Sequence, residues 1–187
     1  RMQAEARLAD RAVAERSAAA QSWSAEAQAS GPLNQLALKV QLRGVAPAGR
    51  TAPALDLQPG LQLLEAWPPA SLRATTQALD LQALHSRAPR TALSGSVELQ
   101  SKALDAPFAA EVRLDNALAG RWSDQRLPVR RLDATVRTPS AAAERVELQH
   151  IELQLGSPGE DAGRLSGQGR WQVDALTFEA QLEGLRP

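Results

Sequence analysis

Strict alternation of apolar and polar residues along several short runs is the feature that most constrains this chain. In "LALKVQLR" (Leu36 to Arg43), Leu36, Leu38, Val40 and Leu42 take every second position, and Lys39, Gln41 and Arg43 lie between them. The same two-residue period recurs in "FAAEVRL" (Phe108 to Leu114), "RLDATVR" (Arg131 to Arg137), "LSGQGRWQV" (Leu165 to Val173) and "LTFEAQLE" (Leu176 to Glu183). Because successive side chains of a strand point to opposite faces, these runs predict strands with one dry face and one wet face. We expect an all-β chain with an antiparallel sheet that is apolar on one side only.

Two runs change phase partway, which predicts β-bulges. In "RVELQHIELQL" the apolar set is Val146 and Leu148 and then Ile151 and Leu153, so one extra residue falls near Gln149 or His150. In "LRATTQALDLQAL" the set shifts from Leu72, Ala74 and Ala78 to Leu79 and Leu81. Bulges bend strands and increase their twist. We therefore expect a strongly curved, elongated sheet rather than a flat one.

The first thirty residues fit two descriptions. "RMQAEARLADRAVAERSAAAQ" has the composition of a good helix. Alternation is nevertheless present at Met2 to Leu8 and again at Trp23 to Ala29, and a helical stripe is hard to draw through either segment. We expect two strands joined by an irregular turn near residues 13–20, with a helix over residues 11–22 as the alternative. One short helical turn is expected within Asp80 to Arg90, before Pro89.

Short repeats indicate strand–turn–strand units stacked along an axis. "LSG" opens both "LSGSVELQ" (Leu93 to Gln100) and "LSGQGRWQ" (Leu165 to Gln172), "ALDLQ" begins at Ala54 and at Ala78, and "VELQ" begins at Val97 and at Val146. Arrays of this kind contact mainly neighbouring units, so their length varies freely. We expect residues 1–187 to form one segment of a repetitive domain, cut from a longer protein.

The balance of charge argues against a nucleic-acid partner. Lys and Arg together number 21, Asp and Glu together number 21, and the net charge is zero, whereas a nucleic-acid surface needs a basic excess. The chain has no cysteine, which fits an oxidising compartment. No apolar run reaches the roughly 18 residues that a membrane-spanning helix needs. Aromatic residues make up only 3% of the chain, so the apolar positions are numerous but offer little bulk for a compact core.

A search for chemistry finds no catalytic or metal-binding constellation. His85 and His150 are the only histidines; the first falls in an expected turn and the second at an expected bulge. A structural zinc site usually needs four Cys or His ligands. "GSPGED" (Gly156 to Asp161) lacks the lysine of a phosphate-binding loop, and the glycines of "GQG" (Gly167 to Gly169) fall on the dry face of a strand. We expect no enzyme activity, no cofactor and no metal.

The four tryptophans fall into two groups. Trp67 and Trp122 lie in expected connections, whereas Trp23 and Trp171 lie on the apolar faces of expected strands. One interpretation is that all four cover the ends of a core. The alternative is that Trp23 and Trp171 line a groove for an acyl chain.

The order of several motifs resembles one family. The motifs are "LDLQAL", "PRTALSG" (Pro89 to Gly95), Asp115-Asn116 followed by Gly120, "RLPV" (Arg126 to Val129), "LSGQGRW" and the closing "LEGLRP". Together they resemble the large repetitive domain of TamB-like translocation and assembly module proteins, within the AsmA-like bridge family of Gram-negative envelopes. The resemblance covers residues 31–187 well and the first thirty residues loosely. The family's membrane anchor and its partner-binding domain have no counterpart in this sequence.

The resemblance implies a long sheet folded lengthwise into an open, taco-like trough with its apolar face inside. It also implies a periplasmic location, as part of a protein anchored in the inner membrane. Members of the family are implicated in carrying phospholipid to the outer membrane, and in assembling outer-membrane proteins with a TamA-like β-barrel partner. Other parts of the full protein would contact that partner.

On this basis we expect a lipid-binding groove along the dry face. Its expected residues are Leu36, Leu38, Val40, Leu42, Val97, Leu99, Val112, Leu114, Ala134, Val136, Gly167, Gly169, Trp171, Val173, Phe178 and Leu182. Glycine in a strand marks a bulge, a bend or a close approach, and we expect Gly95, Gly167 and Gly169 to leave room for a guest.

Three functions remain open from the sequence. The first is a lipid-conducting segment of an envelope bridge. The second is a scaffold for outer-membrane β-barrel proteins, in which a free sheet edge pairs with client strands. The third is an unrelated extracellular structural module with a closed, filled interior.

Overall fold

The fold was obtained as a computed structural model. It describes residues 4–9, 23–46, 51–62, 69–101, 106–139, 145–157, 159, 163–172 and 175–184, with the backbone alone at 4–9 and 69–70. The elements are β1 (Ala4–Ala9), β2 (Trp23–Ser30), η1 (Leu33–Gln35), β3 (Leu36–Gly44), β4 (Ala54–Leu61), β5 (Pro69–Leu79), α1 (Leu81–Leu84), β6 (Leu93–Ser101), β7 (Phe108–Asn116), η2 (Trp122–Asp124), β8 (Val129–Thr138), β9 (Arg145–Leu155), β10 (Gly163–Gln172) and β11 (Ala175–Glu183).

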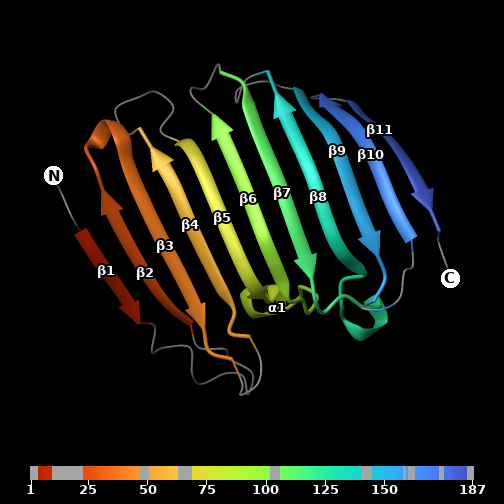
Figure 1. Cartoon of the computed structure of the whole chain (residues 1–187), viewed down its shortest axis with the longest axis horizontal. Helices are drawn as coiled ribbons and strands as arrows, with labels where there is room; N and C mark the ends of the chain where they lie inside the picture. Colours follow the sequence, from red (N-terminus) through yellow and green to blue (C-terminus); the bar gives the residue numbers. More distant parts are fainter. Residues whose placement is uncertain are drawn as a thin grey trace.

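All eleven strands form one antiparallel sheet in which the spatial order equals the sequence order (Figure 1). Each strand pairs with the strand before it and the strand after it, and β1 and β11 form the two edges. The sheet does not close into a barrel, because its order begins at β1 and ends at β11. The prediction of an all-β, open antiparallel sheet is confirmed.

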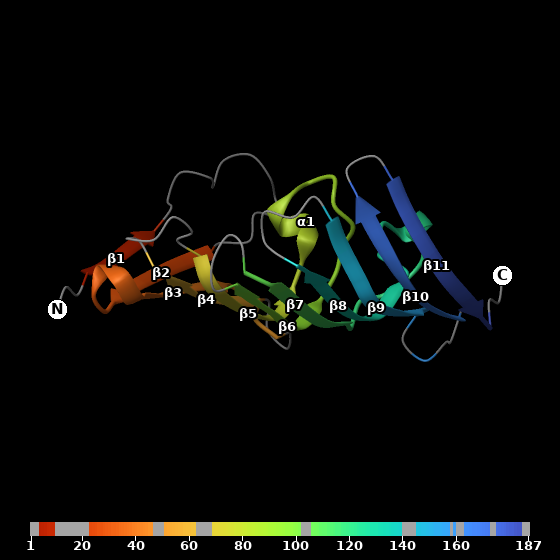
Figure 2. The ribbon, with the colours of Figure 1, turned by 90° about the horizontal axis from the view of Figure 1, so that it is seen from above.

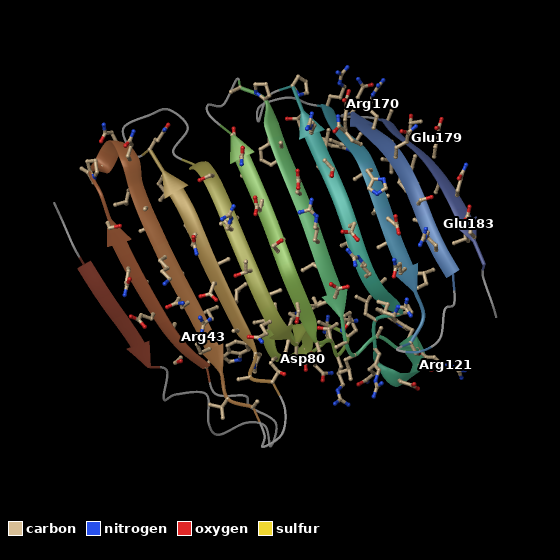
Figure 3. All side chains as sticks on the ribbon, in the orientation of Figure 1. Arg43, Asp80, Arg121, Arg170, Glu179 and Glu183 are labelled. Atoms are coloured by element: carbon tan, nitrogen blue, oxygen red, sulfur yellow. The ribbon has the colours of Figure 1, made fainter. Side chains whose placement is uncertain are left out.

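The register sorts the side chains cleanly between the two faces. A central row crosses β2 to β11 through Ala27, Val40, Leu57, Ala74, Val97, Val112, Ala134, Ile151, Gly167 and Ala180. Each member of this row lies opposite the next across the strand pair, so all of them share one face, which we call the apolar face. On the other, polar face lie the alternate residues, including Arg43, Arg170, Glu179 and Glu183, which Figure 3 shows toward the viewer.

Both predicted bulges are present. Thr135 pairs with His150 whereas Val136 pairs with Leu148, so Gln149 is the extra residue in β9. On β5, Thr76 pairs with Gly95 and Leu79 pairs with Leu93, so two β5 residues lie opposite Ser94. Each bulge resets the alternation so that the apolar residues after it return to the apolar face. Without this reset, the end of each strand would present its leucines to the wrong side.

The bulge in β5 puts one residue in an unfavourable backbone conformation, which a hydrogen bond to the neighbouring strand offsets. Ala78 has φ +47°, a left-handed conformation that residues other than glycine rarely adopt. Its N–H donates to Ser94 Oγ at 3.0 Å. Leu79, the next residue, is 7% exposed and is one of the few buried apolar side chains among those described. The alternation does not extend to Leu81 as expected, because Leu81 begins α1.

The sheet is bent into a shallow trough, and α1 lies on its hollow side (Figure 2). The apolar face lines this hollow, while the polar face forms the outside. No second layer of secondary structure covers the apolar face in the part of the chain that is described. The accessible surface is 13055 Å² for 20.0 kDa, whereas a compact monomer of this mass exposes about 8,700 Å². The chain therefore exposes more surface than a compact two-layered domain of the same mass.

One end of the trough is built from two connections, residues 80–92 and 117–128, which we call the looped end. Arg90 N donates to Gln125 O at 2.7 Å, so the two connections are joined to each other. Asn116, 3% exposed, accepts from Ala92 N at 3.0 Å and from Leu118 N at 3.2 Å, and it donates to Val129 O at 3.1 Å.

Thr91 and Asp80 complete the looped end. Thr91, 2% exposed, donates its hydroxyl to Leu79 O at 3.0 Å and accepts from Leu81 N at 2.9 Å. Asp80 Oδ1 accepts from Gln82 N and from Thr91 N, each at 3.0 Å, and so caps α1. This confirms the prediction of a short helical turn before Pro89.

The first thirty residues contain strands at both described segments. β1 and β2 pair antiparallel from Ala4↔Ala29 to Ala9↔Ser24. The strand interpretation is therefore confirmed at residues 4–9 and 23–30, and the expected turn near residues 13–20 lies outside the described residues. Across the described residues, no helix has the length and apolar character that crossing a membrane requires.

The looped end yields a prediction about stability. Asn116→Ala removes the acceptor for two backbone N–H groups and the donor to a third backbone group, all in a buried setting. We expect the free energy of unfolding to fall by about 3 kcal/mol, measured by denaturant titration. The neighbouring change Asp115→Asn, on the exposed polar face, should shift the free energy by less than about 0.5 kcal/mol. Equal midpoints for the two variants would contradict this account.

Candidate functional site: the apolar face

The register brings the predicted groove residues together on one face. A second row parallel to the central row runs through Ala25, Leu42, Leu55, Thr76, Gly95, Leu114, Leu132, Leu153, Leu165 and Leu182. On the other side of the central row lie Leu99, Val136, Gly169 and Phe178. Leu38 pairs with Ala29, Leu36 with Leu61 and Trp171 with Leu176, all on the same face. Val173 lies outside the described residues.

The apolar face also includes residues that the predicted groove omits. They come from β4, β5 and β9, and the clearest are Leu55, Leu57, Leu72, Ile151 and Leu153. The signal for them was present in the sequence, as the alternation of "ALDLQ" and the phase change in "VELQHIELQL". These strands fill the gaps between the predicted ones, so the apolar surface is continuous from β2 to β11.

One hydroxyl interrupts the leucine-rich row without making it polar. Thr76 lies between Leu55 on β4 and Gly95 on β6. Its Oγ1 lies 3.2 Å from Ala54 O and donates to it, so the hydroxyl is satisfied by the backbone of the neighbouring strand. A satisfied hydroxyl adds little cost to an apolar surface.

The two glycines of β10 do not leave open room. A Cβ built on Gly169 would lie 2.9 Å from Phe178 Cδ2 and 3.0 Å from Thr177 O. A Cβ on Gly167 would lie 3.1 Å from Phe178 Cζ and 2.6 Å from Glu179 O. The expectation that these glycines hold space for a guest is therefore wrong. The ring of Phe178, on the neighbouring strand, occupies the space, as an aromatic side chain commonly does beside glycine in a sheet.

Gly95 on β6 has a different reason for being glycine. Its φ is +148°, and a Cβ there would collide with the carbonyl oxygen of Arg113 on β7. It also lies opposite Thr76, where the β5 bulge begins. The glycines of both "LSG" motifs thus lie against a backbone oxygen of the neighbouring strand, Arg113 O at Gly95 and Glu179 O at Gly167, and Gly167 also lies against the Phe178 ring.

Trp23 and Trp171 do not form one groove. Trp23 pairs with Gly44 at the start of β2, whereas Trp171 pairs with Leu176 on β10. The two rings lie on strands separated by seven others and at opposite ends of the strands. Trp171 is 47% exposed and Trp122, in η2, is 66% exposed, so neither is buried in a core. Trp67 lies outside the described residues.

The polar face carries a dense set of ion pairs. Four of them cross strands: Arg43–Asp56 at 2.9 Å, Arg73–Glu98 at 3.1 Å, Arg164–Glu152 at 3.4 Å and Arg170–Glu147 at 3.8 Å. Hydrogen bonds from Arg43 and Gln41 lower the pKa of Asp56, and a hydrogen bond from Arg131 lowers the pKa of Asp133. Exposed ion pairs of this kind contribute little individually to the stability of the fold, but their charges keep this face hydrated.

Two hollows lie mainly on the polar face. A cavity of about 730 Å³ near the ends of β2 to β5 is lined mainly by polar-face residues such as Gln28, Lys39 and Gln58. A second cavity, of about 570 Å³, is lined by residues that include Glu147 and Arg170. The apolar face has no covering layer of secondary structure among the described residues, so a guest would lie along an open floor.

The described residues offer no group of three or more His, Cys, Asp or Glu side chains suited to a metal ion. His85 follows α1 and is exposed, and His150 is exposed beside the β9 bulge. This arrangement can bind apolar chains on the apolar face while the polar face stays hydrated.

The contact between Phe178 and the β10 glycines is testable by a double-mutant cycle. Gly169→Ala should destabilise the wild-type chain, because the new methyl group meets the Phe178 ring. The cost should be smaller in a Phe178→Ala background, with a coupling of about 1 kcal/mol. Gly167→Ala is the matched comparison: its nearest obstacle is the backbone oxygen of Glu179, so its cost should depend less on residue 178. Identical coupling at both glycines would rule out this distinction.

Asp56 yields a prediction about pH. Its pKa is lowered from the ordinary value of 3.8, so its ionised form stabilises the fold at higher pH. This stabilisation is fully present above that value and is lost as the pH falls through the lower pKa of the folded state. We expect the difference in unfolding free energy between wild type and Asp56→Asn to shrink between pH 5 and pH 2, measured by denaturant titration at each pH. A constant difference over this range would refute the assignment.

Comparison with known proteins gives no further support for any function. No protein-family model matches the chain, and neither a curated protein nor a solved structure matches it.

Proposed function

We propose that the apolar face holds the acyl chains of phospholipid, and that this chain is a segment of an envelope bridge that carries phospholipid between the inner and outer membranes. The single observation that supports this most is the continuous apolar surface from β2 to β11, with no second layer over it among the described residues. Exposed apolar patches of a monomer are normally a few hundred Å², and larger ones mark binding sites.

The energetics favour sliding over tight binding. Each acyl methylene that leaves water gains roughly 0.8 kcal/mol. Adjacent positions in the central row are all small or medium apolar residues, from Ala27 to Ala180. An acyl chain that moves along the central row exchanges one apolar contact for another, so its free energy changes little from strand to strand. A series of similar shallow sites is what transport over a long distance requires.

The two faces give an amphiphile a defined orientation. Acyl chains would lie in the hollow, and the headgroup would remain at the rim in water, because an uncompensated charge is strongly disfavoured on an apolar surface. No covalent step is needed for this transfer. In this proposal the segment works in the periplasm as part of an inner-membrane-anchored protein, and other parts of that protein contact an outer-membrane β-barrel partner.

A charge placed on the apolar face should block lipid binding. Val112 lies in the central row, with Val97 and Ala134 opposite it on the neighbouring strands. We expect Val112→Asp to lower phospholipid binding at least about tenfold, measured as fluorescent phosphatidylglycerol taken up from vesicles and as phospholipid that co-purifies by mass spectrometry. Circular dichroism should show that the sheet persists, because the open trough lets water reach the charge.

The matched control is one residue further along the same strand. Arg113→Ser changes a side chain of the polar face and should leave lipid uptake unchanged. The proposal fails if wild-type protein takes up no phospholipid, or if well-folded Val112→Asp takes up as much as wild type.

A further inference from the structure

The looped end carries a local excess of positive charge. Its arginines are Arg87, Arg90, Arg121 and Arg126, and its only carboxylates are those of Asp80 and Asp124. Asp80 is already engaged as the cap of α1, where its Oδ1 accepts from two backbone N–H groups. Figure 3 shows Arg121 at this end of the sheet, beyond the ends of the strands. The net charge of the whole chain is zero, so the excess is a local feature.

The arginines of the looped end differ from those of the strands in having no acidic partner. Seven strand arginines form ion pairs, and they are Arg43, Arg73, Arg113, Arg131, Arg145, Arg164 and Arg170. The four arginines of the looped end form no ion pair with any residue that the structure describes. Three of them are exposed, and Arg126 is half-buried. Their guanidinium groups therefore remain available to an anion from outside the chain.

Backbone pairing places two of these cations side by side. Arg90 and Arg126 form an isolated parallel β-bridge, in which Arg90 N donates to Gln125 O at 2.7 Å. Residues paired in this way send their side chains to the same side, and like charges at paired positions are destabilising. Proteins retain such unfavourable arrangements mainly at functional sites. The pair therefore marks a place where a bound anion would relieve a repulsion.

Gly120 fixes the side chain of Arg126. A Cβ built on Gly120 would lie 2.6 Å from Arg126 Cδ and 3.2 Å from Arg126 Cβ, so the stem of the arginine lies directly on the glycine backbone. Gly120 is itself buried, and its N–H donates to Leu127 O at 3.1 Å. Because packing already holds the stem of Arg126, less side-chain freedom is lost when its guanidinium group binds a ligand.

The looped end also lies beside the apolar face. Figure 2 shows α1, which belongs to the looped end, on the hollow side of the sheet. Leu114, in the leucine-rich row, lies two residues before the end of β7 at Asn116, a distance of roughly 7 Å along the strand. Trp122 is 66% exposed, and an indole with its polar N–H suits a boundary between apolar chains and water. An amphiphile whose chains lie on the leucine-rich row would therefore have its headgroup at the looped end.

We propose that Arg90 and Arg126 bind a phosphate group, and that this phosphate belongs to the phospholipid whose acyl chains lie on the apolar face. A guanidinium group donates two parallel N–H groups to phosphate oxygens, so two arginines can hold one phosphate from two sides. The lipid source of the phosphate rests on the proposed function, whereas the phosphate site itself rests on the looped end alone. The same chemistry would accept a water-soluble phosphate ester, which is the second source to be tested.

Three soluble probes separate the phosphate from the acyl chains. Dihexanoyl phosphatidylglycerol has both, dihexanoylglycerol has the chains alone, and glycerophosphoglycerol has the phosphate alone. By isothermal titration calorimetry, wild-type protein should bind the phosphatidylglycerol about tenfold more tightly than dihexanoylglycerol. The variant Arg90→Gln/Arg126→Gln should lose this preference and keep the wild-type affinity for dihexanoylglycerol.

A matched control removes two other cations from the same sheet. Lys39 on β3 and Arg137 on β8 are exposed on the polar face, and neither has an ion pair within the described part of the chain. Lys39→Gln/Arg137→Gln gives the same net charge as the test variant and should keep the preference for phosphatidylglycerol. Val112→Asp should instead weaken binding of both lipids, because it acts on the acyl chains. The denaturation midpoint of Arg90→Gln/Arg126→Gln should not fall, since the substitution removes a repulsion.

The possible outcomes separate the phosphate site from the acyl-chain proposal. The phosphate site is overturned if wild type binds both lipids equally, if the test variant keeps the preference, or if the control variant loses it. Equal affinity for glycerophosphoglycerol and phosphatidylglycerol would overturn the lipid source and leave a site for soluble phosphate esters. Tighter binding of a short glutamate peptide would overturn the proposal in favour of an acidic polypeptide. Failure of the acyl-chain proposal has its own signature, which is that wild type binds no dihexanoylglycerol.

Discussion

Hydrophobic burial usually closes a sheet against a second layer, and among the described residues none covers the apolar face of this trough. From β2 to β10, leucines and valines on this face are half-buried by their cross-strand neighbours rather than enclosed, and those of β11 are exposed. The consequences run through the whole molecule. Cohesion must come from the antiparallel ladder, from contacts between adjacent strands and from the looped end. A large apolar area then remains available for a guest, and this is what makes acyl chains a physically reasonable cargo.

The motifs that carry the family resemblance fall largely at the looped end. Thr91 lies within "PRTALSG", Asn116 follows Asp115, and Gly120 donates its N–H to Leu127 O at 3.1 Å. These residues make the buried hydrogen bonds that hold residues 80–92 and 117–128 together. Their spacing therefore reflects a structural requirement, because buried polar groups must find partners. Transport would draw on the apolar rows, where the exact residue matters less than its apolar character.

The two faces of the sheet differ in what they can hold. The apolar face would hold acyl chains without directional bonds, so it would tolerate their movement. The polar face carries ion pairs between neighbouring strands, such as Arg43–Asp56 and Arg73–Glu98, and stays in contact with water.

The sequence alone determined the strands, their bulges and the separation of the two faces. These properties follow from local alternation: a shift of one residue sends a side chain to the other face, so "VELQHIELQL" predicts both a strand and its irregularity. Most groove residues could be named for the same reason. Only the tertiary structure decided what lies beside each glycine. The Phe178 ring on β11 reaches Gly167 and Gly169 on β10, and Arg113 O on β7 crowds Gly95 on β6. It alone also decided that the arginines of β10 turn toward β9, since the choice between two flanking strands depends on register and side-chain geometry across the sheet.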